Sequence, residues 1–290
     1  MNSSRNNSSF NSFAGGTPKY VMEVVIAITA VAVIYFLLGS FQLINAYINR
    51  LEANRVDLLP LTYVMNSGPQ QIVQNPNLPN ALTALPSSNE PTGVEFTYSF
   101  FINVPQQAFN TSGPVGLKHI FHKGSPGQYP LLGPGVYMHS QTNTMRIYMN
   151  TYDTWNNFAE VPNFPVGKYV HITIVCRSMH LEIYVNGNIA SRIGFNISPP
   201  YQNYGDIYAF YNSKPKLPTT LPSLEGDTSF QILGVCEGQL SRLTYFNYAL
   251  SYSEINKMMN QGPSPYVASQ NGSNTTTYLV DNWWTANFTQ

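Results

Sequence analysis

Acidic side chains are the first groups in this chain whose type and spacing could support chemistry, and their pattern argues against catalysis. A retaining glycosidase needs two carboxylates about 5 to 5.5 Å apart, which on one strand requires acids at alternate positions. The close acidic pair here is Glu225 and Asp227, in LEGDTSF, where we expect a loop. Acid–base catalysis needs paired groups on rigid elements. We therefore expect no enzyme activity.

Metal ligation is the second chemistry to weigh. Asp153, Asp206 and Asp227 are scattered candidates for calcium, but no dense cluster of oxygen ligands surrounds any of them. His119 and His122 stand three residues apart in HIFH. On a strand this spacing sends the two imidazoles to opposite faces, so we expect no shared metal. We expect no cofactor, with calcium left open as an alternative.

Aromatic side chains beside polar groups are the third candidate, because sugar sites combine ring platforms with hydrogen-bonding groups. Two segments have this composition, NTYDTWNNF at 150–158 and YQNYGDIYAFY at 201–211, and DNWWTANF adds a tryptophan pair near the C-terminal end. The candidate surface for a ligand or partner is Tyr152, Trp155, Tyr201, Tyr204, Tyr208, Trp283 and Trp284. The alternative is that these rings pack at the rim of a β-sandwich, and a protein partner would use the same surface.

Composition limits the classes of partner. The chain has 290 residues, of which 10% are charged, and its formal net charge is zero. Since the usual charged fraction is roughly 25%, no basic face is available for a phosphate backbone, and we expect no nucleic-acid partner. Cys176 and Cys236 are too few for a disulfide scaffold. We expect two buried thiols, with a single disulfide as the alternative.

An uncharged apolar run at 24–48 predicts a membrane anchor, because crossing a hydrocarbon core takes about 20 apolar residues. Its anchoring side chains would include Val24, Ile28, Val33, Phe36, Leu38 and Phe41. A cleaved signal peptide would have a shorter core and a basic front, and a buried core helix fits such a long run less well. Arg5 and Lys19 precede the run while Arg50 and Arg55 follow it, so the charges give no orientation.

The remaining chain divides by composition. Residues 1–20 are rich in Asn, Ser and Gly and are expected to be disordered, and 21–55 hold the transmembrane helix and its extension. Prolines recur through 56–92, which predicts an extended tether that forms neither a long helix nor paired strands. A β domain is expected at 93–263, followed by a polar tail at 264–290.

Many short strand patterns separated by turn residues fill the β domain. In VEFTYSFFINV, from 94, apolar residues alternate, and HLEIYVNGNIASRI at 180–193 places Asn-Gly between alternating runs, which predicts a β-hairpin. SYSEINKMMNQG is one short helix that Ser251 or Ser253 can cap and Gly262 can end. No helix divides the strands, so we predict an all-β antiparallel sandwich or jelly roll preceded by one transmembrane helix.

Three of these motifs resemble concanavalin A-like, laminin-G-like jelly rolls. VEFTYSFFINV looks like their opening strand, GKYVHITIVCRSMHLEIYVNGNIASR like their central signature, and GQLSRLTYFNYALSYSEINKMMNQG like their closing strand and short helix, over about residues 92 to 263. The resemblance implies a jelly roll in which His171 is structural and near the sheet edge. This fold hosts lectins, glucanases, adhesion modules and structural domains, so it does not decide function.

The order of a short polar start, an N-terminal anchor and one such domain is similar to membrane-anchored virion proteins of large double-stranded DNA viruses. That resemblance implies a single-pass minor capsid protein in the virion inner membrane. Its jelly roll would face the capsid and bind capsid or other coat proteins. The alternative is a membrane-anchored, lectin-like attachment protein whose partner is a glycan.

Overall fold

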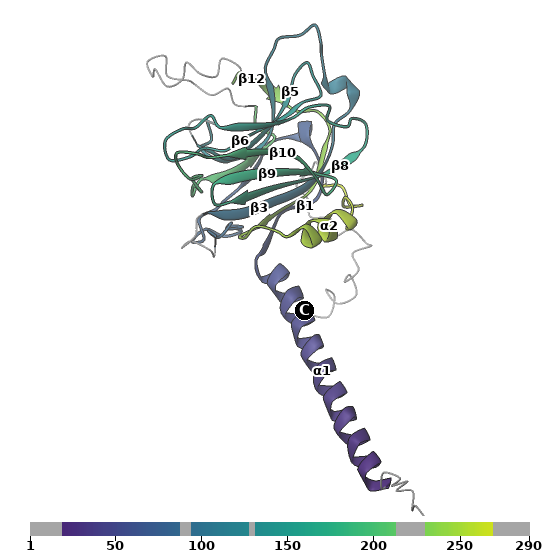
Figure 1. The fold of residues 1–290 in the computed structure, drawn as a ribbon. Helices are drawn as coiled ribbons and strands as arrows, with labels where there is room; N and C mark the ends of the chain where they lie inside the picture. The colour runs from purple at the N-terminus through teal and green to yellow at the C-terminus, as the bar shows by residue number, and fades with distance from the viewer. Residues whose placement is uncertain (1–18, 88–93, 128–130, 213–229, 269–290) are drawn as a thin grey trace, which may run out of the picture. The chain divides into compact units, whose positions relative to one another are not determined.

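The computed structural model describes residues 19–87, 94–127, 131–212 and 230–268 (Figure 1). The chain divides after Ala53 into an N-terminal unit, which holds helix α1, and a second unit that begins at Asn54 and holds the β-sandwich. Of the segment 1–20 that was predicted to be disordered, residues 1–18 lie outside the described residues, whereas Lys19 and Tyr20 belong to α1. The predicted Trp283–Trp284 surface also lies outside the described residues.

Helix α1 (Lys19–Ala53) is long and apolar enough to cross a membrane. Its apolar span, Tyr20–Ile48, has a mean hydropathy of 2.6. At about 1.5 Å per residue this span is roughly 44 Å long, more than the approximately 30 Å of a hydrocarbon core. The hydroxyls of Thr29 and Ser40 donate to the carbonyl oxygens of Val25 and Phe36, so neither is left unpaired on the apolar surface. The predicted anchor side chains Val24, Ile28, Val33, Phe36, Leu38 and Phe41 are all exposed on this helix.

Two sheets form the predicted sandwich. The first has the strand order β1 (Arg55–Val64), β13 (Gln239–Phe246), β3 (Glu95–Asn103), β8 (Tyr169–Arg177), β9 (His180–Val185) and β10 (Asn188–Gly194), all antiparallel. The second has the order β2 (Gln70–Ile72), β11 (Asp206–Ala209), β4 (Leu117–Gly124), β5 (Leu132–His139), β6 (Met145–Tyr148) and β7 (Phe158–Val161), with β12 (Ile232–Val235) parallel to β4. Two short 3₁₀ turns, η1 (Met65–Ser67) and η3 (Gln106–Ala108), follow β1 and β3.

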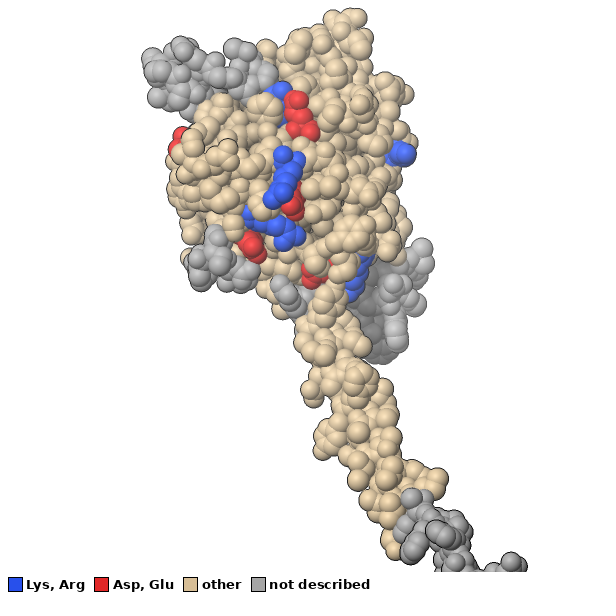
Figure 2. Space-filling view, viewed as in Figure 1, with Lys and Arg blue, Asp and Glu red and all other residues tan. Residues whose placement is uncertain are grey.

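Charged side chains are sparse on the face of the molecule that Figure 2 presents. Several of the charges are paired. Glu182 on β9 lies 3.2 Å from Arg177 on β8 and 3.6 Å from Arg192 on β10. Because paired charges at a surface contribute little to stability, the fold must depend on its apolar interior.

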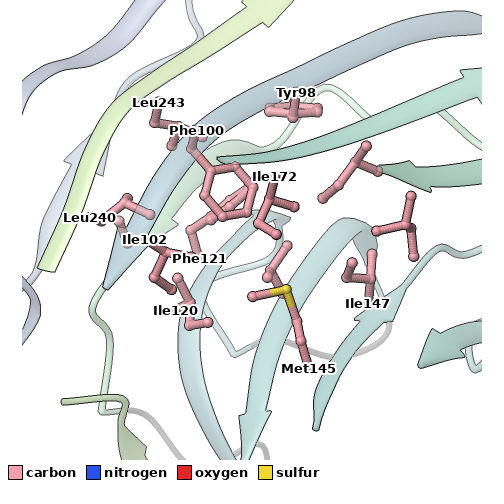
Figure 3. Close-up of a cluster of buried hydrophobic side chains, with 14 of the residues drawn as sticks. Tyr98, Phe100, Ile102, Ile120, Phe121, Met145, Ile147, Ile172, Leu240 and Leu243 are labelled. Carbon is pink, nitrogen blue, oxygen red and sulfur yellow. The ribbon is translucent and has the colours of Figure 1, made fainter. Parts of the chain in front are cut away.

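The core lies between the two sheets and is rich in aromatic rings (Figure 3). Tyr98, Phe100 and Ile102 alternate along β3 and are fully buried, as the sequence pattern predicts. The ring of Phe100 meets that of Phe121 on β4 edge to face, with centroids 5.3 Å apart. Burying one such side chain stabilises the fold by about 1.5–3 kcal/mol, so this layer holds the sheets together.

The predicted hairpin and short helix are both confirmed. Asn186 and Gly187 have φ of 48° and 78° at the turn between β9 and β10, which is the left-handed pair that a type I′ turn requires. Helix α2 (Tyr252–Asn260) begins at a capping box, in which the Ser251 side chain accepts from the Glu254 amide and Glu254 accepts from the Ser251 amide.

The prediction of a tether over 56–92 is wrong for its first half, because this segment supplies β1 and β2. β1 pairs with β13 from Arg55 opposite Phe246 to Val64 opposite Gln239. Pro60 is exposed and lies between Leu59 and Thr62, where the register shifts. Since β1 is the last strand of its sheet, a residue without an N–H costs no ladder bond there. The sandwich unit therefore begins at Asn54 rather than at 93.

The polar tail predicted from 264 also starts inside the fold. The Thr62 amide donates to the Tyr266 carbonyl at 2.8 Å, and the Ala268 amide donates back to the Thr62 carbonyl at 2.8 Å. Val267 thereby forms a parallel bridge to Thr62. Residues 264–268 thus cover part of the outer edge of β1.

Cys176 and Cys236 are buried free thiols, so the disulfide alternative is excluded. Burial raises the pKa of both thiols, that of Cys236 to about 12. A thiol held in its neutral form is unreactive, which makes both residues packing groups.

A substitution at Leu59 tests whether this segment is a β strand or a tether. It is 4% exposed, so we expect Leu59→Ala to lower the free energy of unfolding by about 2–5 kcal/mol through the cavity it leaves. The matched control, Leu78→Ala, removes a leucine that is 50% exposed and should cost less than about 0.5 kcal/mol. Denaturant unfolding measures the free energy of unfolding of both variants. Equal, small losses would contradict the strand and favour an extended tether.

Candidate functional site

The loop 200–205, which leads into β11, lies between two hollows of the sandwich unit. On one side the Tyr201 amide donates to the Asn150 carbonyl at 2.9 Å. On the other side the Asn203 side-chain amide donates to the Lys123 carbonyl at 3.0 Å. A side chain at Gly205 would overlap the backbone of Gly124, so the loop can approach β4 this closely only with glycine there.

The first hollow, the tyrosine pocket, has a volume of about 340 Å³ and is lined by Leu131, Asn150, Thr151, Tyr152, Asp153, Thr154, Trp155 and Tyr201. Tyr152 is 68% exposed, and its ring meets that of Tyr201 with centroids 5.0 Å apart. Sequence reasoning predicted both tyrosines, and the structure brings them together from segments 49 residues apart.

Asp153 supplies a hydrogen-bond acceptor at the rim of the tyrosine pocket. Its Oδ1 accepts from the Thr151 hydroxyl at 2.6 Å, and this bond holds the pKa of the carboxyl below its ordinary value. Asp153 is exposed and ionised at neutral pH. Two adjoining aromatic rings beside an anionic acceptor can hold a polar ring whose hydroxyls point at the carboxylate.

Trp155 is not the exposed platform that the sequence predicts. Its side chain is 9% exposed, stacks on Tyr148 at 6.2 Å and meets Phe230 at 5.0 Å. These rings belong to a second apolar cluster, on the opposite side of β5 and β6 from the sandwich core, formed by Leu117, Leu132, Tyr137, Tyr148, Trp155, Phe230 and Ile232. Trp155 therefore contributes to the lining of the tyrosine pocket from a packed position.

The prediction that Tyr208 belongs to a ligand surface is also wrong, because this residue is buried, whereas Tyr204 is accessible. Tyr208 is 6% exposed, and its ring stacks on His122 at 5.2 Å and meets Tyr211 edge to face at 4.9 Å. Tyr204 is 78% exposed and lines the second hollow.

This second hollow, the lysine pocket, has a volume of about 450 Å³ and is lined by Gln74, Asn75, Pro76, Thr83, Ala84, Pro86, Lys123, Gln202, Asn203, Tyr204 and Asp206. Sequence reasoning missed Lys123, because a lysine in a strand pattern is expected at the surface. It also missed the pocket wall formed by residues 74–86, which lies within the segment assigned as a tether.

The two histidines of HIFH lie on the same side of β4, which corrects the sequence prediction. The pairing of β4 with β5 shifts register between His119 and Phe121, so the simple alternation of faces fails. His119 Nε2 and His122 Nδ1 are 2.8 Å apart. His171, expected near a sheet edge, lies instead on the interior strand β8, 2.8 Å from the Ser99 hydroxyl.

The hydrogen bonds of this histidine pair fix its protonation. The Tyr211 amide donates to His119 Nδ1 at 3.0 Å, so His119 carries its proton on Nε2 and donates it to His122 Nδ1. His122 Nε2 then donates to the Ser125 carbonyl at 2.8 Å. Every ring nitrogen is used with both rings neutral, so neither has a lone pair left for a metal ion.

Calcium gains no support from the acidic candidates. Asp153 lines the tyrosine pocket and Asp206 the lysine pocket. Both carboxylate oxygens of Asp206 accept hydrogen bonds, from the Gln74 amide at 2.9 Å and the Gln71 side chain at 2.8 Å. Among the described residues no three His, Cys, Asp or Glu side chains are grouped to hold a metal. Glu225 and Asp227 lie outside those residues.

Comparison with known proteins gives the family. A model described as the Concanavalin A-like lectin/glucanases superfamily matches residues 79–256. This match covers more than half of the chain, so the chain belongs to that superfamily.

Solved structures with a similar fold include the receptor binding domain of botulinum neurotoxin D. It is 11% identical with a TM-score of 0.42, and the match covers 58% of this chain and 37% of that one. The binding domain of Paraclostridial Mosquitocidal Protein 1 is 15% identical with a TM-score of 0.39, and the match covers 58% and 37%. The matched region is thus little more than a third of those chains, and likeness at this level carries no functional argument. No curated protein matches the chain.

Buried neutral histidines should make the fold sensitive to acid. Burial lowers the pKa of His122 and His171 to about 4 and that of His119 well below its ordinary value. Because the unfolded chain takes up these protons near pH 6.5 and the folded chain does not, stability falls as pH drops below 6.5. At pH 5.5 each histidine should cost about 1.4 kcal/mol of unfolding free energy.

Denaturant unfolding at pH 7.5 and 5.5 measures this loss. His180→Gln is the control, because it removes a partly exposed histidine and keeps the three buried ones, so that most of the loss of stability should remain. Equal stability at the two pH values would mean that the buried histidines accept protons in the folded state.

Proposed function

We propose that this protein is a non-enzymatic, membrane-anchored carbohydrate-binding protein that recognises a glycan at the tyrosine pocket. The observation that carries the proposal is the meeting of Tyr152 and Tyr201 at 5.0 Å beside the ionised Asp153. Sugar sites combine an aromatic face for the C–H side of a ring with acceptors for its hydroxyls. Membership of a lectin and glucanase superfamily is consistent with this role.

The absence of catalysis is part of the proposal. Each hollow is lined by one carboxylate among the described residues, Asp153 in the tyrosine pocket and Asp206 in the lysine pocket. Glycosidases need two carboxyl groups across the scissile bond. Asp206 is moreover engaged by two donors from Gln71 and Gln74, which suits a positioning role better than proton transfer.

A structural role in a coat is the second candidate, with the chain as a minor capsid protein that links the inner membrane of a virion to its shell. The observation that favours it is the edge strand β10, whose side chains are mostly exposed. Ile189 on this strand is 54% exposed and the nearby Ile197 is 88% exposed. An exposed edge strand with apolar side chains is a natural docking edge for another chain.

The glycan proposal is tested on the full chain in nanodiscs, with binding to a glycan array as the readout. Tyr152→Ala should reduce binding at least tenfold, because it removes half of the aromatic face. Tyr252→Ala removes a tyrosine that is 61% exposed on α2 and should leave binding unchanged. A blank array, together with cross-links from the exposed Lys168 or Lys257 to coat proteins in purified particles, would replace the lectin role with the structural one.

The anchor is tested by placing a charge in the middle of α1. Val33→Arg should disfavour membrane insertion by about 2.5–3.5 kcal/mol and release the protein into the soluble fraction on alkaline extraction. Asn77→Arg, at an exposed position of the sandwich unit, should stay in the membrane. The mass of the mature chain separates an anchor from a signal sequence, since a chain that begins beyond Ile48 would contradict anchoring.

A further inference from the structure

Lys123 is an unusual lining group for a pocket in a chain of such low charge. It lies near the end of β4, and its side chain is buried, with 2% exposure for the residue. Its ammonium donates one hydrogen bond, to the Gly205 carbonyl at 2.6 Å. Among the described residues no carboxylate lies within 4.0 Å of it to form an ion pair. Two of its three N–H groups therefore remain available.

Burial acts on the charge of this lysine as well as on its donors. Desolvation lowers the pKa of Lys123 to about 8, against the opposing field of Asp206. The ammonium form still dominates at pH 7. A desolvated cation with free donors is stabilised most by an anionic oxygen, because charge-assisted hydrogen bonds are about twice as strong as neutral ones.

The other polar groups around the pocket are largely committed to the fold. Gln202 donates to the Tyr245 hydroxyl at 2.6 Å, and Asn203 bridges the Lys123 carbonyl and the Gly205 amide. Gln74 is bound to the Leu82 carbonyl and the Ala84 amide. These bonds make the walls rigid and leave Lys123 as the main unsatisfied donor.

The rim adds features that suit a ring. The ring of Tyr204 is exposed, and Pro76 and Pro86 present apolar surfaces. The side-chain oxygen of Asn75 accepts from the Asn77 backbone amide at 3.0 Å, which leaves the side-chain NH₂ of Asn75 to donate. Each oxygen of Asp206 has a lone pair remaining after the bonds described above, so hydroxyl groups can donate to it.

We propose that the lysine pocket binds an acidic saccharide, with the anionic group of the sugar on the Lys123 ammonium and its ring against Tyr204. Carboxylate and sulfate-ester sugars share this chemistry. The site goes beyond the proposed function, because it has no lining residue in common with the tyrosine pocket.

The test is titration calorimetry of the full chain, in nanodiscs of uncharged lipid, with three matched probes. These are methyl glucuronide, glucose 6-sulfate and methyl glucoside, which carry a carboxylate, a sulfate and no charge. We expect the acidic sugars to bind at least tenfold more tightly than methyl glucoside. Binding of one acidic sugar alone identifies the anion, whereas equal binding of all three, or of none, overturns the proposal.

Variants assign the binding to this pocket. Lys123→Met should reduce the affinity at least tenfold and Tyr204→Ala should weaken it severalfold, whereas Tyr252→Ala, on α2 and in neither pocket, should leave it unchanged. Because Lys123→Met also removes the bond to Gly205, its melting temperature is compared with that of the parent chain. If Lys123→Met does not fold, the affinity of Tyr204→Ala shows whether the sugar binds in this pocket, since an exposed ring contributes little to folding.

A direct readout of the ammonium is the NMR titration of ¹³Cε-labelled lysine. The Lys123 resonance should titrate near pH 8 and move to higher pH when an acidic sugar is added. An unmoved titration with the sugar bound would place the ligand elsewhere. If Tyr152→Ala fails to affect glycan-array binding while these results hold, the tyrosine pocket is wrong and the lysine pocket stands.

Discussion

The hydrogen bonds of the Tyr245 hydroxyl join the core of this molecule to the walls of the lysine pocket. The ring is fully buried in the aromatic layer, 5.1 Å from Tyr98, and a buried phenol needs hydrogen-bond partners. It donates to the Leu85 carbonyl at 2.6 Å and accepts from the Gln202 side chain at 2.6 Å. The segment after β2 and the loop 200–205 are thereby tied to the same core residue. Both walls of the lysine pocket depend on this bond pair.

In a chain with so few charges, hydrogen bonds between polar groups inside the fold hold the segments near the surface in place. His119 and His122 form a chain from the Tyr211 amide to the Ser125 carbonyl, in which every nitrogen has a single role. Such a chain works only with both rings neutral, since a second proton on either ring would set two donors against each other. The hydrogen bonds that fix β4 beside β11 therefore make the fold less stable at pH values at which a histidine in the unfolded chain is protonated.

Local patterns were sufficient to predict the elements whose causes are local. Asn186-Gly187 specifies its turn through left-handed backbone angles, and Ser251 with Glu254 specifies the start of α2. The failures are non-local. Pro60 predicts the end of a strand unless the strand is known to lie at the edge of its sheet. The bulge after His119 can be identified only from the pairing of β4 with β5. The burial of Trp155 depends on Phe230, which lies 75 residues away. Lys123 forms a pocket only because residues 74–86 and 202–206 fold around it.

In the proposed function, the two hollows on either side of one loop would serve a protein anchored to a membrane. A hollow of a few hundred cubic ångströms with few free polar groups gives modest affinity for one sugar, because much of the contact energy offsets the ordering of the ligand. Anchoring changes this balance. Copies confined to a membrane meet a multivalent glycan surface at high effective concentration, and successive contacts become intramolecular. The rigidity of the pocket walls then matters more than the strength of any one contact, because each pocket must already have its binding shape when the next sugar of the glycan reaches it. The hydrogen bonds of Tyr245 and Asn203 hold the loop 200–205 in place without a ligand and would keep the pockets in this shape.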